Sequence, residues 1–429
     1  MSALLFLFLF GFMLLGIPIA FCLILAGAGF LAISDSRPMI IVAQKIMVGM
    51  DSFPLLAIPL FICTGFLMEA TSMSARLVAF VEAFSGRVRG SVGIICIVSC
   101  TIFAALTGSG PATVAAIGAI MLPALLKSGY AKHTAAGLIA AGGALGPIIP
   151  PSIAMIVYGA TMNESITKMF MGSIIPGLFL AFLLIVANQL FIVPKLDRSM
   201  AKEKYTIKEK VRLTWRASGT LLLPIIILGG IYGGIFTPTE ASVVGVVYGI
   251  LLAFFLKELN FARLLRVLER TVETSSTVVF ILGASSLFAW LLTVTKIPYL
   301  VTEAVMAVIS SKYVYLALLT MLLFLVGTLM ETLVSIVILA PIVVPTGLTL
   351  GIDPLHLGCL FCINLIVGFI SPPFGINLFT AVSVTGVKYN DVVKGVLPFL
   401  AALMIGVICI TFIPQIVLWL PDLLYGAPR

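Results

Sequence analysis

Charged residues are scarce along this chain. Asp, Glu, Lys and Arg make up 10% of its 429 residues, and hydrophobic residues make up 61%. Soluble domains carry about 25% charged residues. A chain this apolar cannot cover itself with polar groups, so lipid must solvate much of it. Its longest polar stretch, Lys195 to Thr220, is too short for a soluble domain.

Residues that carry catalytic or redox chemistry are equally sparse. The two histidines, His133 and His356, stand at the ends of apolar segments expected on opposite faces, and no Ser/His/Asp set or metal cluster accompanies them. The seven cysteines all lie in apolar runs, where small buried hydrophobes are the usual interpretation. No Lys or Arg precedes Arg37, so we expect no cleavable signal peptide.

The apolar segments themselves indicate an all-α polytopic membrane protein. They are continuous rather than alternating, and the chain has room for roughly ten to fourteen spans or half-spans. The net charge of +8 does not indicate nucleic-acid binding, because no basic patch contains interleaved aromatic residues. Lys and Arg instead mark cytoplasmic loops.

An internal repeat organises the chain. One constant offset in residue number superposes helix-breaking residues of the two halves. The matched pairs are Gly146 and Gly368, Pro150 and Pro372, Pro151 and Pro373, Pro123 and Pro345, Gly129 and Gly351, and Pro176 and Pro398. We therefore predict a first repeat at 1–194, a basic cytoplasmic linker at 195–217, a second repeat at 218–421 and a tail at 422–429.

The charges predict that the second repeat is inverted. Basic residues flank one pair of apolar segments in the first half, and their counterparts at the same offset in the second half are uncharged. The bias reverses at Asn163-Glu164, whose partner region holds Lys388 and Lys394. Positive residues face the cytoplasm, so the halves have opposite topology, as in many secondary transporters. Both termini are then expected outside the cytoplasm. The basic flanking residues are Arg76, Arg87, Arg89, Lys127, Lys132 and His133.

Five crossings are expected between Lys132 and Lys296, and an odd number inverts the second half. They are about 135–160, 170–193, 218–236, 239–256 and 273–295. The amphipathic stretch 257–270 is expected on the cytoplasmic surface, and its counterpart, about 36–50, on the periplasmic surface. The N-terminal run is expected to split at Gly16-Ile17-Pro18 into two short helices.

Four breaks interrupt apolar sequence where a transporter would bind its cargo. Two are polar tips, Thr107–Thr113 and Gly327–Ser335, inside expected re-entrant hairpins at about 91–127 and 313–347. The others, Gly146–Ser152 and Gly368–Asn377, break helices expected at about 134–160 and 357–384. Proline frees backbone carbonyls, which membranes tolerate where they line a cavity. Helix N-termini can then hold a carboxylate, and carbonyls and hydroxyls can hold a cation. The alternative is that Gly and Pro only kink packed helices.

Glu331 stands alone as an acid at a predicted hairpin tip. Intramembrane acids are functional candidates. Its role can be to stabilise the tip, to bind a cation, to carry a proton, or simply to cap the start of a helix.

At these residues the chain resembles the large membrane (M) subunit of tripartite ATP-independent periplasmic (TRAP) transporters. The resemblance covers essentially the whole chain and is most specific at Leu67–Ser91, Thr107–Pro123, Gly142–Tyr158 and Gly368–Phe379. It implies a bacterial inner-membrane carrier that works with a small four-helix Q subunit and a soluble periplasmic binding protein. It further implies sodium-driven elevator transport of a carboxylate, without other cofactors; the sialic acid branch looks closest. Residues 72–86 would form an arm helix.

The resemblance also implies where ions and substrate bind. One sodium site would comprise Ser109, Gly110, Thr113, Gly146 and Pro147. A second would comprise Thr328, Glu331, Ser335, Gly368 and Ser371. Substrate contacts would come from Thr107, Gly108, Pro150, Ser152, Thr332, Pro372 and Asn377.

Other functional classes make different predictions. A stand-alone sodium-coupled carboxylate carrier of similar design would need no binding protein. A channel would pass current without ion coupling. We see no EAA-type coupling loop of an ABC permease, and a membrane enzyme lacks a candidate catalytic set.

Overall fold

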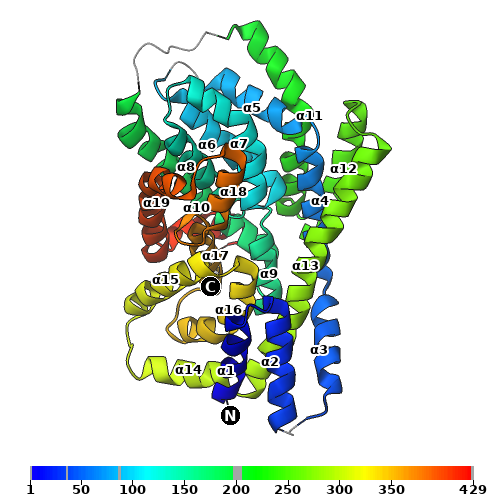
Figure 1. Cartoon of the computed structure of the whole chain (residues 1–429), viewed down its shortest axis with the longest axis vertical. Helices are drawn as coiled ribbons and strands as arrows, with labels where there is room; N and C mark the ends of the chain where they lie inside the picture. The colour runs from blue at the N-terminus through cyan, green and yellow to red at the C-terminus, as the bar shows by residue number, and fades with distance from the viewer. Residues whose placement is uncertain (1, 35–36, 86–87, 197–204, 427–429) are drawn as a thin grey trace.

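Every regular element of the described chain is a helix (Figure 1). The computed structural model describes residues 2–34, 37–85, 88–196 and 205–426. The first half contains α1 (Ser2–Leu14), α2 (Ile19–Ser34), α3 (Ile40–Met50), η1 (Phe53–Leu56), α4 (Ala57–Glu69), α5 (Met73–Phe84), α6 (Ser91–Thr107), α7 (Gly110–Lys127), α8 (Lys132–Ala144), α9 (Ile153–Met162), α10 (Ile166–Ala187), η2 (Asn188–Ile192) and η3 (Val193–Lys195). The second half contains α11 (Ile207–Tyr232), α12 (Pro238–Phe255), α13 (Phe261–Val294), α14 (Ile297–Met306), α15 (Lys312–Leu329), α16 (Thr332–Thr349), α17 (Pro354–Val367), η4 (Gly368–Ile370), α18 (Ile376–Thr385), α19 (Tyr389–Phe412) and α20 (Gln415–Tyr425).

Full-length and short apolar helices coexist in this fold. Eight described helices are long and apolar enough to cross a membrane, or nine if the pair Ile40–Met50 and Phe53–Glu69, bent by 60°, is one span. The shorter apolar helices have 10–17 residues, below the roughly 20 that a span needs. The predicted spans and half-spans thus separate into these two groups. Helices α7, α15 and α16 are themselves long and apolar enough to cross a membrane. Their re-entrant course therefore stays a prediction.

The helix boundaries repeat at the spacing of the sequence repeat. Helix α7 spans 110–127 and α16 spans 332–349, so both ends are displaced by the offset that superposes Gly146 on Gly368. Helices α8 and α17 begin at 132 and 354, with the same displacement, and α9 and α18 begin at 153 and 376, one residue more than that displacement. The peptide bonds Pro150-Pro151 and Pro372-Pro373 are both cis. The same order of elements therefore occurs in both halves.

The two halves interdigitate rather than pack as separate blocks. Helix α7 packs against α18 of the second half, and α16 packs against α9 of the first. Helix α8 also crosses α19 closely: a Cβ on Gly137 would lie 2.2 Å from the carbonyl carbon of Gly395. Glycine at this crossing lets the two backbones meet. Helices α8 and α17 carry apolar residues on all faces and lie buried in the centre, as such helices must.

The chain departs from two predicted boundaries. From Phe261 onward, the predicted amphipathic stretch and the crossing at 273–295 form one continuous helix, α13, because no glycine or proline interrupts them before Gly283. Helix α11 begins at Ile207, inside the predicted linker, where Thr206 and Glu209 form a capping box. Residues 197–204 of that linker lie outside the described part of the chain. Figure 1 shows α12 and α13 along one side of the molecule, beside α4 and α3.

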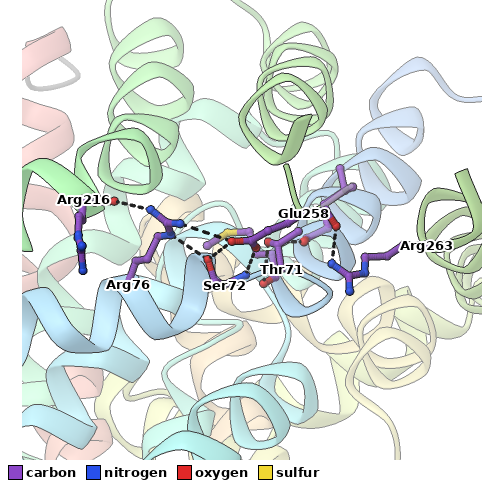
Figure 2. Close-up of polar contacts among 8 residues, drawn as sticks. Thr71, Ser72, Arg76, Arg216, Glu258 and Arg263 are labelled. Atoms are coloured by element: carbon purple, nitrogen blue, oxygen red, sulfur yellow. Dashed lines mark hydrogen bonds and ion pairs between the residues drawn. The ribbon is translucent and has the colours of Figure 1, made fainter. Parts of the chain in front are cut away.

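The start of α5 is held by an acid from the second half. The Glu258 carboxylate, in the turn between α12 and α13, accepts hydrogen bonds from Ser72 N at 2.6 Å and Ser72 Oγ at 2.5 Å. Arg76 also reaches Glu258, at 3.4 Å, and donates to the Arg216 carbonyl (Figure 2). Partial burial opposes ionisation of Glu258, but the Ser72 hydrogen bonds and the Arg76 charge outweigh it and lower its pKa. This contact ties α5, which lies between α4 and the first hairpin, to α11 and α13.

Candidate functional site

The two predicted hairpin tips meet at one cavity of about 190 Å³. The first tip lines it with Thr107–Ala112, and the second lines it with Glu331–Leu333. Pro147 of the first helix break and Phe369 of the second also line it. Residues of α4 and α13 contribute further lining. Segments from opposite halves of the sequence therefore form one site.

The first tip is a sharp helix-to-helix connection. Helix α6 ends at Thr107, and the residue that caps it, Gly108, has a φ of 58°, which favours glycine. Ser109 then caps α7 through its side chain, with Ala112 N 3.4 Å from Ser109 Oγ. Thr113 Oγ1 donates to the Ser109 carbonyl at 2.8 Å and lies 3.3 Å from Thr107 Oγ1. These contacts gather hydroxyl and carbonyl oxygens at the tip.

The first helix break packs directly on this tip. A Cβ on Gly146 would lie 2.6 Å from the Ser109 carbonyl oxygen and 2.9 Å from Thr113 Oγ1. A Cβ on Gly108 would likewise lie 2.6 Å from the Pro151 carbonyl oxygen. The predicted residues of the first ion site thus lie together, around the Ser109 carbonyl.

The second tip uses an acid where the first uses a serine. The Glu331 carboxylate caps α16 by accepting from Leu333 N at 3.0 Å and Val334 N at 3.2 Å. Ser335 Oγ donates to the Glu331 carbonyl at 2.9 Å, as Thr113 does to Ser109 at the matching position of the first repeat. Thr332 is buried, and its Oγ1 has no hydrogen-bond partner among the described residues. Capping is therefore one role that Glu331 fills in the structure.

The second break sits differently from the first. A Cβ on Gly368 would lie 2.3 Å from the Gly327 carbonyl carbon, so this break meets the end of α15 rather than the start of α16. Thr328 donates to the Leu325 carbonyl at 2.6 Å. Ser371 is buried, and its Oγ lies 3.5 Å from the Pro372 carbonyl oxygen. The predicted residues of the second ion site are thus spread along α15, α16 and the break.

The predicted substrate residues separate into two groups. Thr107, Gly108 and Thr332 line the cavity. The other four are not among its lining residues. Ser152 donates to the Pro147 carbonyl and caps α9. Pro150 is buried within the first break, and Pro372 is partly exposed. Asn377 is buried against the first half and donates to the Ala140 carbonyl at 3.3 Å.

The part of the cavity lining that comes from α4 and α13 was not predicted from the sequence. It consists of Ile62, Gly65 and Phe66 of α4 and Thr274 and Val278 of α13. The hydroxyl-rich run Thr274-Ser275-Ser276-Thr277 was an available signal on α13. No such signal marks α4, because its rotation relative to the tips depends on packing.

The described residues that line the cavity are mostly apolar, and one of them is ionisable. Of the described residues that line it, none is Lys, Arg or His, and Glu331 is the single acid. An anion here would be held without a basic side chain of these residues, by backbone amides at the starts of α7 and α16 and by the hydroxyls of the lining Ser and Thr residues. The α16 end already carries the Glu331 carboxylate, so the α7 end is the more favourable of the two for an anion.

Comparison with known proteins gives a consistent family. The family model described as "Tripartite ATP-independent periplasmic transporter, DctM component" matches residues 6–416. The C4-dicarboxylate TRAP transporter large permease protein DctM of Vibrio cholerae is 37% identical, covering 99% of this chain and 98% of that protein. The sialic acid TRAP transporter large permease protein SiaM of the same species is 31% identical, covering 97% of each.

A longer relative and a solved structure extend the comparison. The isethionate TRAP transporter permease protein DctMQ of Oleidesulfovibrio alaskensis is 37% identical over 94% of this chain, which spans 64% of that protein's length. The crystal structure of the Alcanivorax borkumensis YdaH transporter matches with a TM-score of 0.63, at 14% identity, over 90% of this chain and 88% of that one. That likeness concerns the fold alone.

Proposed function

Because the chain belongs to the DctM component family of tripartite ATP-independent periplasmic transporters, we propose that it carries a small organic carboxylate across the bacterial inner membrane. Transport is coupled to sodium. The observation that carries this proposal is the convergence of two hairpin tips and a broken helix on one cavity. Broken helices of this kind hold substrate and coupling ions in secondary transporters.

The charge of Glu331 gives coupling a physical reason. A carboxylate substrate entering this cavity meets the Glu331 carboxylate and no basic side chain among the described lining residues. Two like charges in a poorly hydrated site repel each other strongly. A cation bound at the second tip offsets the Glu331 charge, and one at the first tip adds attraction near the α7 amides. Substrate then binds well only when cations are present.

The remaining parts of the proposal follow the family. The chain works with a small membrane subunit and a soluble periplasmic binding protein, which delivers the substrate. The tip-bearing helices move against α4 and α13 in an elevator-type motion. Both termini lie on the periplasmic side. Sialic acid is one candidate substrate, alongside the C4-dicarboxylates in the name of another relative. Isethionate, in the name of a third relative, is a sulfonate and serves as the test of the carboxylate preference.

Uptake into proteoliposomes tests this function. Vesicles contain this chain and its small membrane subunit, with or without the binding protein, under an inward sodium gradient. Labelled sialic acid, a C4-dicarboxylate and isethionate are compared. We expect uptake of one of the two carboxylates that needs both sodium and the binding protein, whereas uptake of isethionate alone would contradict the carboxylate assignment. Sodium-driven uptake without the binding protein would favour a stand-alone carrier, and current without coupling would indicate a channel.

The first ion site is tested in the same assay. Ser109→Ala removes the hydroxyl that caps α7, and Thr113→Val removes the hydroxyl facing Gly146. We expect each to raise the half-saturating sodium concentration severalfold. Unchanged sodium dependence in both variants would contradict the assignment.

A further inference from the structure

Asn377 is a buried side chain with half of its amide unsatisfied. It lies on α18 of the second half and is 0% exposed. Its Nδ2 donates to the Ala140 carbonyl of α8 at 3.3 Å. Its Oδ1 has no hydrogen-bond partner among the described residues. Because the nitrogen must face the Ala140 oxygen, the amide cannot be flipped, and Oδ1 is held on the other side.

That side is the first hairpin tip. A Cβ on Gly110, the first residue of α7, would lie 2.8 Å from Asn377 Oδ1 and 3.2 Å from the Gly143 carbonyl oxygen. Gly143 lies close as well, with 3.2 Å between its added Cβ and Asn377 Nδ2. Two glycines thus let the amide reach the backbone. The Gly143 carbonyl is another acceptor, so it cannot satisfy Oδ1.

The residue before Gly110 contributes another oxygen of the tip. Gly110 follows Ser109, whose carbonyl lies against Gly146 next to Thr113 Oγ1. The Gly143 carbonyl near the end of α8 therefore lies beside Gly110, as the unsatisfied Asn377 oxygen does, and the Ser109 carbonyl and the Thr113 hydroxyl belong to the same tip. The Ser109 carbonyl accepts from Thr113, and the Gly143 carbonyl accepts from Gly146 N, but Asn377 Oδ1 has no donor among the described residues. A buried acceptor in this state calls for a cation or a donor group. Oxygens of unwound backbone and half-helix ends are what coordinate sodium in broken-helix transporters.

We infer that Asn377 supplies a ligand from the second half of the chain to the sodium site of the first hairpin tip. This inference rests on the proposed sodium coupling. The inference assigns Asn377 to the sodium ion and not to the substrate, because Asn377 does not line the cavity. The matching position of the first repeat is Met155, which offers no side-chain oxygen. The first ion site therefore depends on both halves, and sodium bound there joins α18 to the first hairpin.

The test measures sodium binding separately from transport. Full-length protein in lipid nanodiscs is melted at increasing sodium chloride, with choline chloride holding ionic strength constant. Asn377→Leu keeps the shape and removes the unsatisfied oxygen, so it should fold normally without sodium. We expect it to raise the sodium concentration that gives half of the melting shift at least fivefold. Asn377→Asp, protonated on the oxygen that faces the Ala140 carbonyl, retains an oxygen toward the tip and should keep the response.

A matched control and the contrary results complete the test. Thr220, on α11, also has a buried side-chain oxygen without a hydrogen-bond partner among the described residues. Thr220→Val removes this oxygen and should leave the sodium response unchanged. A wild-type response in Asn377→Leu would overturn the Asn377 inference while leaving the coupling proposal in place. No sodium response in the wild-type protein would overturn the coupling proposal itself. If Asn377→Leu does not fold, Gly110→Ala, whose Cβ would push Oδ1 away, should show the same rise.

Discussion

At the scale of single residues, glycine decides how closely a helix break can approach a tip. Gly146 touches the Ser109 carbonyl and Thr113 hydroxyl, and Gly368 touches the Gly327 backbone. We expect Gly146→Ala to lower sodium-driven uptake at least tenfold, because its Cβ would lie 2.6 Å from a backbone oxygen. Gly229→Ala on α11, with no atom within 4 Å of its Cβ, is the control and should be stabilised by about 0.5–1 kcal/mol. Normal uptake by Gly146→Ala would contradict this packing.

Glu331 allows a cap to be separated from an ion ligand. Glu331→Gln keeps an oxygen that can accept from Leu333 N and Val334 N, whereas Glu331→Ala loses it. We expect Glu331→Ala to lower the free energy of unfolding by about 1 kcal/mol, and Glu331→Gln to lower it less. Both should weaken the sodium dependence of uptake, because both remove the charge. Melting curves and sodium titrations separate the effects: a Gln variant with wild-type sodium affinity would leave Glu331 as a cap only.

At the scale of elements, α5 depends on a carboxylate that its own sequence does not provide. Its N-cap residue, Ser72, makes no capping hydrogen bond of its own. Glu258 supplies the acceptor from the turn after α12. An ion pair between Glu69 and Arg270, at 2.9 Å, joins the preceding end of α4 to α13. The start of α5 is thus fixed to the turn before α13, and the preceding end of α4 is fixed to α13 itself. The other end of α5 leads toward the hairpin helix α6.

This anchor predicts a pH dependence. The folded-state pKa of Glu258 is lowered, so its contribution to stability is present above the unfolded value of about 4.3. That contribution is lost as the pH falls through the folded value. We expect Glu258→Gln to melt below wild type at pH 7, and the gap to close below about pH 4. Glu269→Gln, at an exposed position on α13, is the control. A gap of the same size at pH 7 and at low pH would contradict the ionic anchor.

At the scale of the whole molecule, two halves with the same element order pack into each other. Their loops differ in charge, which predicts opposite orientation in the membrane. We expect reporters inserted at 163–165 to lie outside the cytoplasm and reporters at 386–388 to lie inside. An alkaline phosphatase, active only outside, and a fluorescent protein, active only inside, measure this. The same side for both loops would contradict the inverted repeat.

Local sequence was enough to establish the lipid solvent, the helical class and the places where helices break. Apolar content selects lipid, and proline and glycine interrupt hydrogen bonding wherever they occur. The breaks at Gly146 and Gly368 and the tips at Ser109 and Glu331 could therefore be found from the order of residues alone. The family could also be recognised, because its motifs lie at these breaks.

Which surfaces face each other was settled by packing. That α18 packs on α7, that Asn377 turns its oxygen to the opposite half, and that α4 and α13 close the cavity all depend on the rotation of one helix against another. That rotation follows from the interlocking of side chains far apart in sequence. The second break likewise meets α15 and not α16 because glycines at 327 and 368 allow contact there. Local sequence therefore determines where helices break, whereas tertiary packing determines which segments each break contacts.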